Sequence, residues 1–320
     1  MSLISYNNEL ELLPTGFINL GATCYFNALL QSILSCTSFI DVIISEKDSS
    51  NNNITKLIIN YIETNKEYET LLGQKNTETK LHYLKNKLNK YAPVIWKEMV
   101  TLLCKKKKIP VQSFMQGQQC AGEGFYYLLE SMEMFPLIQK LFLHRYKSLI
   151  HCFECKKWIS DVECLYSLFD VEANLNSEQL VKFNKYHINS ENMNEFISKQ
   201  SSYVEGFKCD TCKKKDDKFK LNVLVMVPEI LVVMSKKYTK ERKLDIHTDF
   251  PKQMKFNGTK NKMTYEAVAQ IEHSGSKHGG HYWAIVKRKN GWFKINDMSV
   301  SPAEFQPTKN TYIVFYHLSF

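Results

Sequence analysis

The 320-residue sequence predicts an α+β fold, in which helices and antiparallel strands occupy separate parts of the chain. Apolar side chains recur at helical spacing in several segments between residues 24 and 132. In the later part, apolar and polar residues alternate, most clearly over 263–273 and 281–286. Helices that are grouped apart from strands are typical of α+β folds.

The composition is that of a globular protein with a full core. Hydrophobic residues make up 44% of the chain, and its length suits one large domain or two modest ones. No signal peptide is evident at the start of the sequence. No stretch is apolar enough to span a membrane either, because the most apolar segment, 221–234, contains Pro228 and Glu229. We therefore expect an intracellular protein without membrane association. Its nine cysteines should then be reduced, so clustered cysteines indicate metal binding or catalysis.

The formal net charge of +9 comes from lysines that are spread along the chain. A nucleic-acid-binding module would gather basic and aromatic residues on one element, so we do not expect nucleic acid as a partner. The one dense run, Lys105–Lys108, is interpreted as a solvated loop. The abundance of Asn, Lys and Ile is a bias that would fit a large DNA virus or an AT-rich parasite.

The first predicted helix, over about 24–35, begins with a cysteine. Small residues precede Cys24, and Thr23 is placed to act as the N-cap. A thiol in the first turn of a helix lies near unpaired N–H groups and the positive end of the helix dipole, which favour the thiolate. Cysteine is also among the most frequently buried residues, so taken alone Cys24 is better explained by core packing.

Three further apolar stripes predict helices before residue 134. They consist of Ile54, Leu57, Ile58 and Tyr61; of Leu81, Leu84 and Leu88; and of Phe125, Leu128, Leu129 and Met132. The last helix carries Glu123 near its beginning, where a negative charge is favourable.

Two Cys-x-x-Cys pairs follow, on either side of a long intervening segment. The first pair is Cys152 and Cys155, and the second is Cys209 and Cys212. Four thiolates on two tight turns are typical of a closed, structural zinc site, so we predict zinc as the cofactor. The flanking segments, 158–171 and 219–234, resemble strands, which indicates that the metal joins the tips of an antiparallel extension.

A histidine-bearing hairpin is predicted near the end of the chain. His281 enters an alternating strand, a turn at 289–291 reverses the chain, and the return strand ends at Asn296 and Asp297. Either of these two residues can therefore come to lie beside His281. Cysteine, histidine and a carboxamide or carboxylate are the parts of a thiol acyl-transfer site.

These residues together resemble the ubiquitin-specific proteases. The segments Gly16–Gln31 and Gly279–Asn296 are similar to the two signature boxes of that family, and Gln118–Glu123, the cysteine pairs and a terminal strand at 312–316 follow in the family's order. The resemblance implies a papain-like cysteine protease fold in a single catalytic domain over 1–320. It would consist of a helical thumb at about 16–140, zinc-stapled β fingers with palm strands at about 141–235, and an antiparallel β palm at about 236–320.

The resemblance also implies roles for individual residues. Cys24 would be the nucleophile and His281 the base, oriented by Asn296 or in part by Asp297, and Asn19 would donate to the oxyanion. His273 and His278 are rival candidates for the base, but neither matches the family position. Residues expected to bind substrate are Glu123, Gln119, Gly279, Gly280 and Tyr282.

The implied activity is that of a deubiquitinase, which hydrolyses the isopeptide or peptide bond after the C-terminal glycine of ubiquitin. Ubiquitin and ubiquitinated proteins would be its partners, and we expect a monomer. Cys120 departs from the family, which has an aspartate there, and losing that carboxylate would weaken a contact to the ubiquitin tail by about 1–3 kcal/mol.

Three alternatives follow from these departures and from the charge. The chain could be a protease for another ubiquitin-like modifier, or a non-catalytic protein that binds ubiquitin or a related modifier. A zinc-containing nucleic-acid module is the third, and the scattered lysines argue against it.

Overall fold

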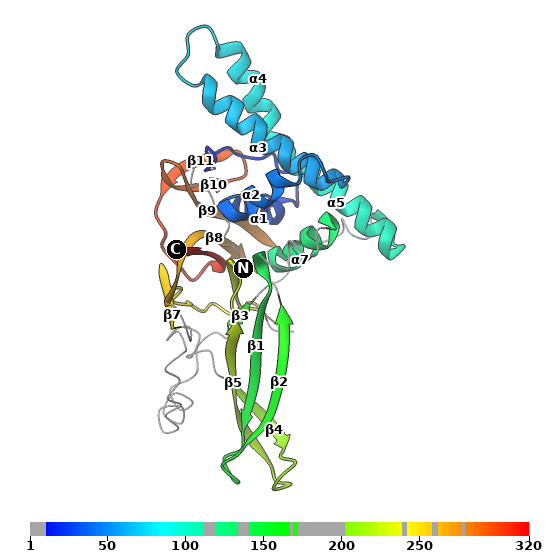
Figure 1. Ribbon diagram of the computed structural model, residues 1–320, viewed down its shortest axis with the longest axis vertical. Helices are drawn as coiled ribbons and strands as arrows, with labels where there is room; N and C mark the ends of the chain where they lie inside the picture. Colours follow the sequence, from blue (N-terminus) through cyan, green and yellow to red (C-terminus); the bar gives the residue numbers. More distant parts are fainter. Residues whose placement is uncertain are drawn as a thin grey trace.

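The computed structural model describes residues 11–111, 120–133, 141–166, 169–171, 202–238, 242–257, 262–276 and 279–319. Gln118, Gln119 and His278, which the sequence analysis singled out, lie outside these ranges. Helices come first along the chain and strands follow, as predicted (Figure 1).

The helices agree with the predicted apolar stripes. Their bounds are α1 Cys24–Ile33, α2 Thr37–Ser45, α3 Asn53–Leu71, α4 Glu78–Asn89, α5 Tyr91–Lys107 and α7 Ala121–Met132. Every residue of α1 is buried, because it lies between the other helices and the face of a sheet. The run Lys105–Lys108 was predicted to be a loop, but it forms the end of α5. There Lys106 pairs with Glu130 of α7 at 3.0 Å.

A large antiparallel sheet supports α1. Its strand order is β11-β10-β9-β8-β12-β6-β3, and β7 pairs with β8. Only β3 and β6 are parallel among its described pairs. The bounds are β3 Phe169–Val171, β6 Ile230–Ser235, β7 Gln253–Asn257, β8 Lys262–Gly275, β9 Gly280–Arg288, β10 Gly291–Asn296, β11 Ser299–Ala303 and β12 Thr311–Ser319.

A second, narrower sheet extends away from the helices (Figure 1). Its order is β2-β1-β5-β4, with bounds β1 His144–His151, β2 Trp158–Tyr166, β4 Ser202–Lys208 and β5 Lys215–Met226. The β1–β2 and β4–β5 turns lie together at its far tip, and these turns carry the Cys-x-x-Cys pairs.

The core joins the helices to the large sheet. The Phe125 ring on α7 packs edge-on against Phe142 at 5.3 Å and against Phe315 of β12 at 5.9 Å between ring centroids. Cys36, which belongs to neither Cys-x-x-Cys pair, is fully buried. Within the described ranges, no single helix is both long and apolar enough to cross a membrane.

The hairpin of β9 and β10 forms as predicted. Lys289 and Asn290 make the turn, and Gly291 follows with a φ of +122°, a conformation that favours glycine. Antiparallel pairing sets Ile295 opposite Ala284, so the end of β10 returns beside the start of β9. This register brings Asn296 and Asp297 next to His281.

Candidate active site

Cys24 begins α1 and lies against the histidine-bearing strand. Cys24 is 4% exposed, and the backbone of Tyr282 on β9 lies close enough to the sulfur to lower the pKa of the thiol. Thr23 occupies the N-cap position but makes no capping hydrogen bond with its side chain. Its hydroxyl accepts from the N–H of Leu20 and donates to Asn19 instead. The predicted cap therefore stabilises the preceding loop rather than the helix.

The prediction that the helix terminus favours the Cys24 thiolate is wrong, because the pKa of the thiol is raised when all contributions are taken together. Burial raises the pKa of the Cys24 thiol above its ordinary value, and the Asp297 carboxylate raises this pKa further. Backbone hydrogen bonds from Tyr282 and Tyr25 lower the same pKa by a smaller amount. At neutral pH the group is thus mainly a thiol, and a base must remove its proton before it can attack.

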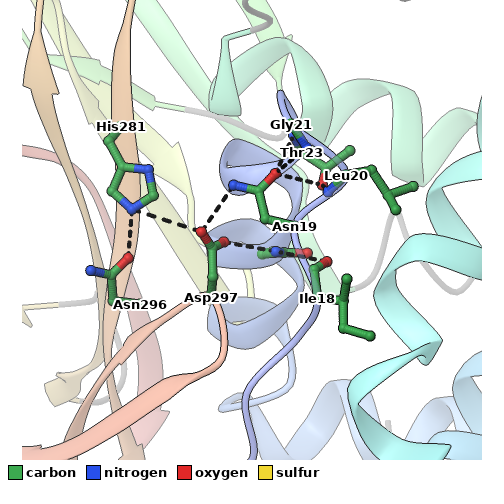
Figure 2. A network of polar contacts seen from close by, with 9 residues as sticks. Ile18, Asn19, Leu20, Gly21, Thr23, His281, Asn296 and Asp297 are labelled. Carbon is green, nitrogen blue, oxygen red and sulfur yellow. Dashed lines mark hydrogen bonds and ion pairs between the residues drawn. The ribbon is translucent and has the colours of Figure 1, made fainter.

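His281 stands at the start of β9 with one ring nitrogen engaged. Its Nε2 lies 2.5 Å from Asn296 Oδ1 and 3.9 Å from Asp297 Oδ2. Figure 2 shows both residues on the same side of the imidazole. Asn296 is therefore the direct partner, and Asp297 the more distant one. A ring that donates from Nε2 keeps Nδ1 as its acceptor nitrogen.

His273, one of the two rival histidines, does not compete for this position. His273 is buried on β8, where its Nδ1 lies 2.8 Å from the Tyr238 hydroxyl and 2.9 Å from Lys243 Nζ. Burial, together with the nearby Lys243, lowers the pKa of His273 to about 4. His273 is thus a neutral structural residue whose Nδ1 is already engaged. His278 lies outside the described residues.

Asn19 has a fixed amide orientation. Its Oδ1 accepts from the backbone N–H of Gly21 at 2.9 Å and of Thr23 at 3.2 Å. Its Nδ2 donates to Asp297 Oδ2 at 2.9 Å. The amide group therefore holds its N–H side toward Asp297 and His281, as Figure 2 shows.

Asp297 is the residue that joins the two halves of the site. It has a φ of +49°, and its backbone carbonyl accepts from the N–H of Phe17 at 2.9 Å. A Cβ on Gly16 would lie 2.6 Å from that same carbonyl oxygen, so this crossing requires glycine. Asp297 Oδ1 accepts from the side chain of Asn27 at 2.8 Å. Sequence reasoning missed Asn27, although an amide among the buried residues of α1 was a signal.

The predicted substrate-binding residues differ in their exposure. Glu123 is exposed in the first turn of α7, and Gly279 and Gly280 are exposed before and at the start of β9. A Cβ on Gly280 would lie 2.4 Å from His273 Nε2, so packing alone already requires glycine there. The Tyr282 side chain is 3% exposed and cannot contact a substrate as predicted; only its backbone faces the thiol.

Cys120 occupies the N-cap position of α7. Its Sγ lies 2.9 Å from the Tyr312 hydroxyl, and burial raises the pKa of its thiol. The backbone N–H groups of Gly122 and Glu123 are close enough to lower this pKa, but the side chain makes no capping hydrogen bond. The neutral Cys120 thiol therefore occupies a position in which a carboxylate would have these N–H groups and the Tyr312 hydroxyl as nearby donors.

The four paired cysteines form a cluster that fits a metal ion. Sγ of Cys152 lies 3.7 Å from that of Cys212, and Sγ of Cys155 lies 3.8 Å from that of Cys209. All four sulfurs lie within 4.8 Å of one another. Sulfur atoms at the corners of a regular tetrahedron around zinc are about 3.8 Å apart, given a zinc–sulfur distance of about 2.3 Å. The donor set and its spacing thus match a closed zinc site.

A family model described as "Ubiquitin carboxyl-terminal hydrolase" matches residues 15–316. The chain belongs to this family. A probable ubiquitin carboxyl-terminal hydrolase 8 of Schizosaccharomyces pombe is 23% identical and aligns over 94% of this chain and 64% of its own length. Ubiquitin carboxyl-terminal hydrolase 4 of Arabidopsis thaliana is 23% identical over 90% of this chain and 85% of its own.

This member of the family spans only part of some relatives. It covers 29% of ubiquitin carboxyl-terminal hydrolase 36 of Drosophila pseudoobscura pseudoobscura, which is 26% identical over 95% of this chain. The relatives just named come from a yeast, a plant and a fly, so they give no support to a viral source.

Solved structures of the family share the fold. The chain aligns over 99% of its length with a chain of the SAGA Ubp8/Sgf11/Sus1/Sgf73 DUB module bound to ubiquitin aldehyde. The TM-score is 0.66 at 19% identity, and 72% of that chain is covered. Another structure of the Ubp8-Sgf11-Sgf73-Sus1 SAGA DUB module gives a TM-score of 0.61 at 18% identity, covering 96% of this chain and 68% of the other. The predicted α+β, papain-like fold is confirmed.

Proposed function

We propose that the protein is a thiol-dependent deubiquitinase that hydrolyses the bond after the C-terminal glycine of ubiquitin. The observation that carries the proposal is the arrangement of Cys24, His281 and Asn296, with the thiol beside the backbone of β9 and the imidazole bonded to Asn296. Membership of the family supports ubiquitin as the modifier, and so does the similar chain in a module bound to ubiquitin aldehyde.

The reaction would proceed through a thioester. His281 takes the proton from Cys24 Sγ, and the sulfur forms a bond to the carbonyl carbon of the glycine. The carbon–nitrogen bond then breaks, and the amine of the substrate lysine leaves with a proton from His281. Water next attacks the thioester and releases the ubiquitin carboxylate and the free thiol. Asn296 keeps the imidazole in the tautomer that accepts at Nδ1.

Asn19 would stabilise the charge that develops on the carbonyl oxygen. Its Nδ2 has two hydrogens, and only one is used by Asp297. Removal of such a donor typically lowers the rate by about 10²–10³-fold. Asp297 would orient this amide and add negative charge near the imidazolium, at 3.9 Å from Nε2.

The Cys152, Cys155, Cys209 and Cys212 cluster would hold a structural zinc ion. The ion would close the tip of the β1–β2–β5–β4 sheet, which corresponds to the fingers in the proposed division into thumb, fingers and palm. Glu123, Gln119, Gly279 and Gly280 would contact the ubiquitin tail. We further propose a monomer that acts inside the cell, without a membrane or nucleic acid as partner.

The function is tested with suicide probes. Purified, zinc-loaded protein is incubated with ubiquitin that carries a thiol-reactive C-terminal group, and with the same probe built on other ubiquitin-like modifiers. We expect a covalent adduct with ubiquitin. An adduct with another modifier alone would favour the alternative protease, and no adduct with any probe would favour the non-catalytic binder.

Cys120→Asp is expected to increase both stability and ubiquitin turnover. The new carboxylate would accept from the N–H groups of Gly122 and Glu123 and from the Tyr312 hydroxyl, and an N-cap of this kind contributes about 1 kcal/mol. It would also restore the charge that the ubiquitin tail meets in relatives. Thermal melting measures the first effect, and kcat/KM on a ubiquitin substrate measures the second. Cys120→Asn, which caps without charge, is the control; equal turnover by both variants would contradict the charge argument.

The Cys24 alkylation rate is expected to rise with pH beyond the range of an ordinary cysteine. Burial and Asp297 raise the pKa of the thiol, so the reactive thiolate is scarce near neutral pH and accumulates only in alkaline solution. The measurement is the iodoacetamide rate constant against pH, read by mass spectrometry at Cys24. Asp297→Asn should move the profile toward lower pH. A plateau already reached at pH 6 in the wild type would contradict this prediction.

A further inference from the structure

The buried amide of Asn27 connects three parts of the active site. Asn27 lies on α1 one turn after Cys24 and is 3% exposed. Its Nδ2 donates to Asp297 Oδ1 at 2.8 Å and to the backbone carbonyl of Ile18 at 3.3 Å. One NH₂ group therefore joins the nucleophile helix, the segment that carries Asn19, and the end of β10.

The orientation of this amide is determined by its partners. Both neighbours of Nδ2 are acceptors, so a flipped amide would set Oδ1 against a carboxylate and a carbonyl oxygen. Oδ1 itself is buried without a hydrogen-bond partner among the residues that the structure describes. A buried acceptor without a partner is unfavourable, so the favourable contribution of this side chain comes from the two hydrogen bonds that Nδ2 donates.

Asn27 Nδ2 holds the Asp297 carboxylate, whose two oxygens have different partners. Oδ1 of Asp297 is engaged by Asn27, while Oδ2 accepts from Asn19 Nδ2 at 2.9 Å and faces His281 Nε2 at 3.9 Å. Two hydrogen bonds to separate oxygens fix the plane of the carboxylate. Without the bond to Oδ1 the carboxylate can rotate, and the Asn19 amide loses its fixed partner.

We propose that Asn27 is a positioning residue. It fixes Asp297, and Asp297 in turn holds the Asn19 amide toward the oxyanion and its own charge toward His281. This inference rests on the proposed function, because it assigns a role in that reaction. The inference goes beyond the proposed function because it assigns an effect on the reaction rate to a side chain that touches no reacting atom.

The test is Asn27→Asp, assayed from about pH 5.5 to pH 8.5 with a ubiquitin substrate. Two carboxylates at about 3 Å repel each other, which raises one pKa of the pair above the ordinary carboxyl range, so the pair keeps a proton in the acidic part of the assay range and loses it at alkaline pH. When protonated, the new side chain donates to Asp297 as Asn27 does. The ionisable groups nearest the pair are Cys24 and His281, which both proteins share, and the uncharged Asn27→Ala variant serves as the reference for their own titration.

We expect that ratio to be about 0.1 or lower at pH 8 and to rise as the pH falls, with KM changed less than kcat. Asn27→Ala should also lose kcat, but with a ratio that does not depend on pH. The Asn27→Ala variant therefore tests the positioning role if the Asn27→Asp variant does not fold. The control is Asn65→Asp, at an equally buried asparagine whose side chain bonds the backbone of Leu13, away from Asp297. It should lose stability without a pH-dependent kcat ratio.

The outcomes separate the inference from the proposed function. A wild-type protein without turnover of any ubiquitin substrate would overturn the function itself. An active wild type whose Asn27→Asp variant keeps its kcat within twofold over the whole pH range would overturn the positioning role. The same holds if Asn27→Ala keeps full kcat while its melting temperature falls.

Discussion

Cys24→Ala is expected to abolish ubiquitin hydrolysis while the protein still binds ubiquitin. Removing the nucleophile of a comparable hydrolytic triad lowers kcat by about 10⁶-fold, because the remaining groups cannot form the covalent intermediate. Cys24 is 4% exposed and packed at the start of α1, so an alanine there removes one sulfur and disturbs little else. The measurement is release of a fluorophore from the ubiquitin C-terminus, together with a binding titration on the same samples.

The matched control is Cys36→Ala. Cys36 is also buried in the helical core, and its Sγ contacts only the Ser32 carbonyl, at 3.8 Å, among the hydrogen bonds described. This variant should lose some stability by the cavity it leaves, but should keep its turnover. If Cys24→Ala retained measurable turnover above about one-thousandth of the wild type, another group would have to be the nucleophile.

Removal of zinc is expected to cause the second large effect, and to cause it far from the nucleophile. Structural zinc in small sites contributes an apparent binding free energy on the order of 10 kcal/mol, which becomes folding free energy for the segments it joins. The tips of the β1–β2 and β4–β5 hairpins depend on the Cys152, Cys155, Cys209 and Cys212 cluster. A strong chelator, or Cys209→Ser, should therefore loosen this tip.

Hydrogen exchange, zinc content and kinetics measure this effect together. We expect one zinc per wild-type chain and none bound stably by Cys209→Ser, with fast exchange confined to the tip and its strands. The KM for a ubiquitin substrate should increase, whereas alkylation of Cys24 by a small reagent should stay the same. Cys104→Ala, a buried cysteine on α5 outside the cluster, is the control. A purified chain without zinc that shows slow exchange at the tip would contradict the zinc assignment.

The sequence predicted the elements of the site well because their signals are local. The turn at 289–291 sets the register of a hairpin, and that register alone places Asn296 beside His281. The spacing within each Cys-x-x-Cys pair likewise predicts two turns that can share one ion. Local sequence left open whether Asn296 or Asp297 would contact the imidazole.

The features that the sequence did not predict depend on packing between distant segments. The effect of a helix terminus on Cys24 is local, but the burial that outweighs it arises from β9 and the helices around α1. Tyr282 was expected to face the substrate, whereas β9 turns its ring inward against His273, with 4.3 Å between ring centroids. The bond from Asn27 to Asp297 joins residues 270 positions apart, and no local pattern reports such a pair.

The same long separations affect how the protein is made. Asn19 and Asp297 meet across 278 positions, so the loop between them must close before the site exists. During synthesis, a ribosome-bound chain exposes Cys24 and its helix early but cannot supply His281, Asn296 or Asp297 until β9 and β10 have emerged. On the proposed mechanism, a nascent or truncated chain that ends before β10 therefore lacks protease activity, although its Cys24 helix is already present.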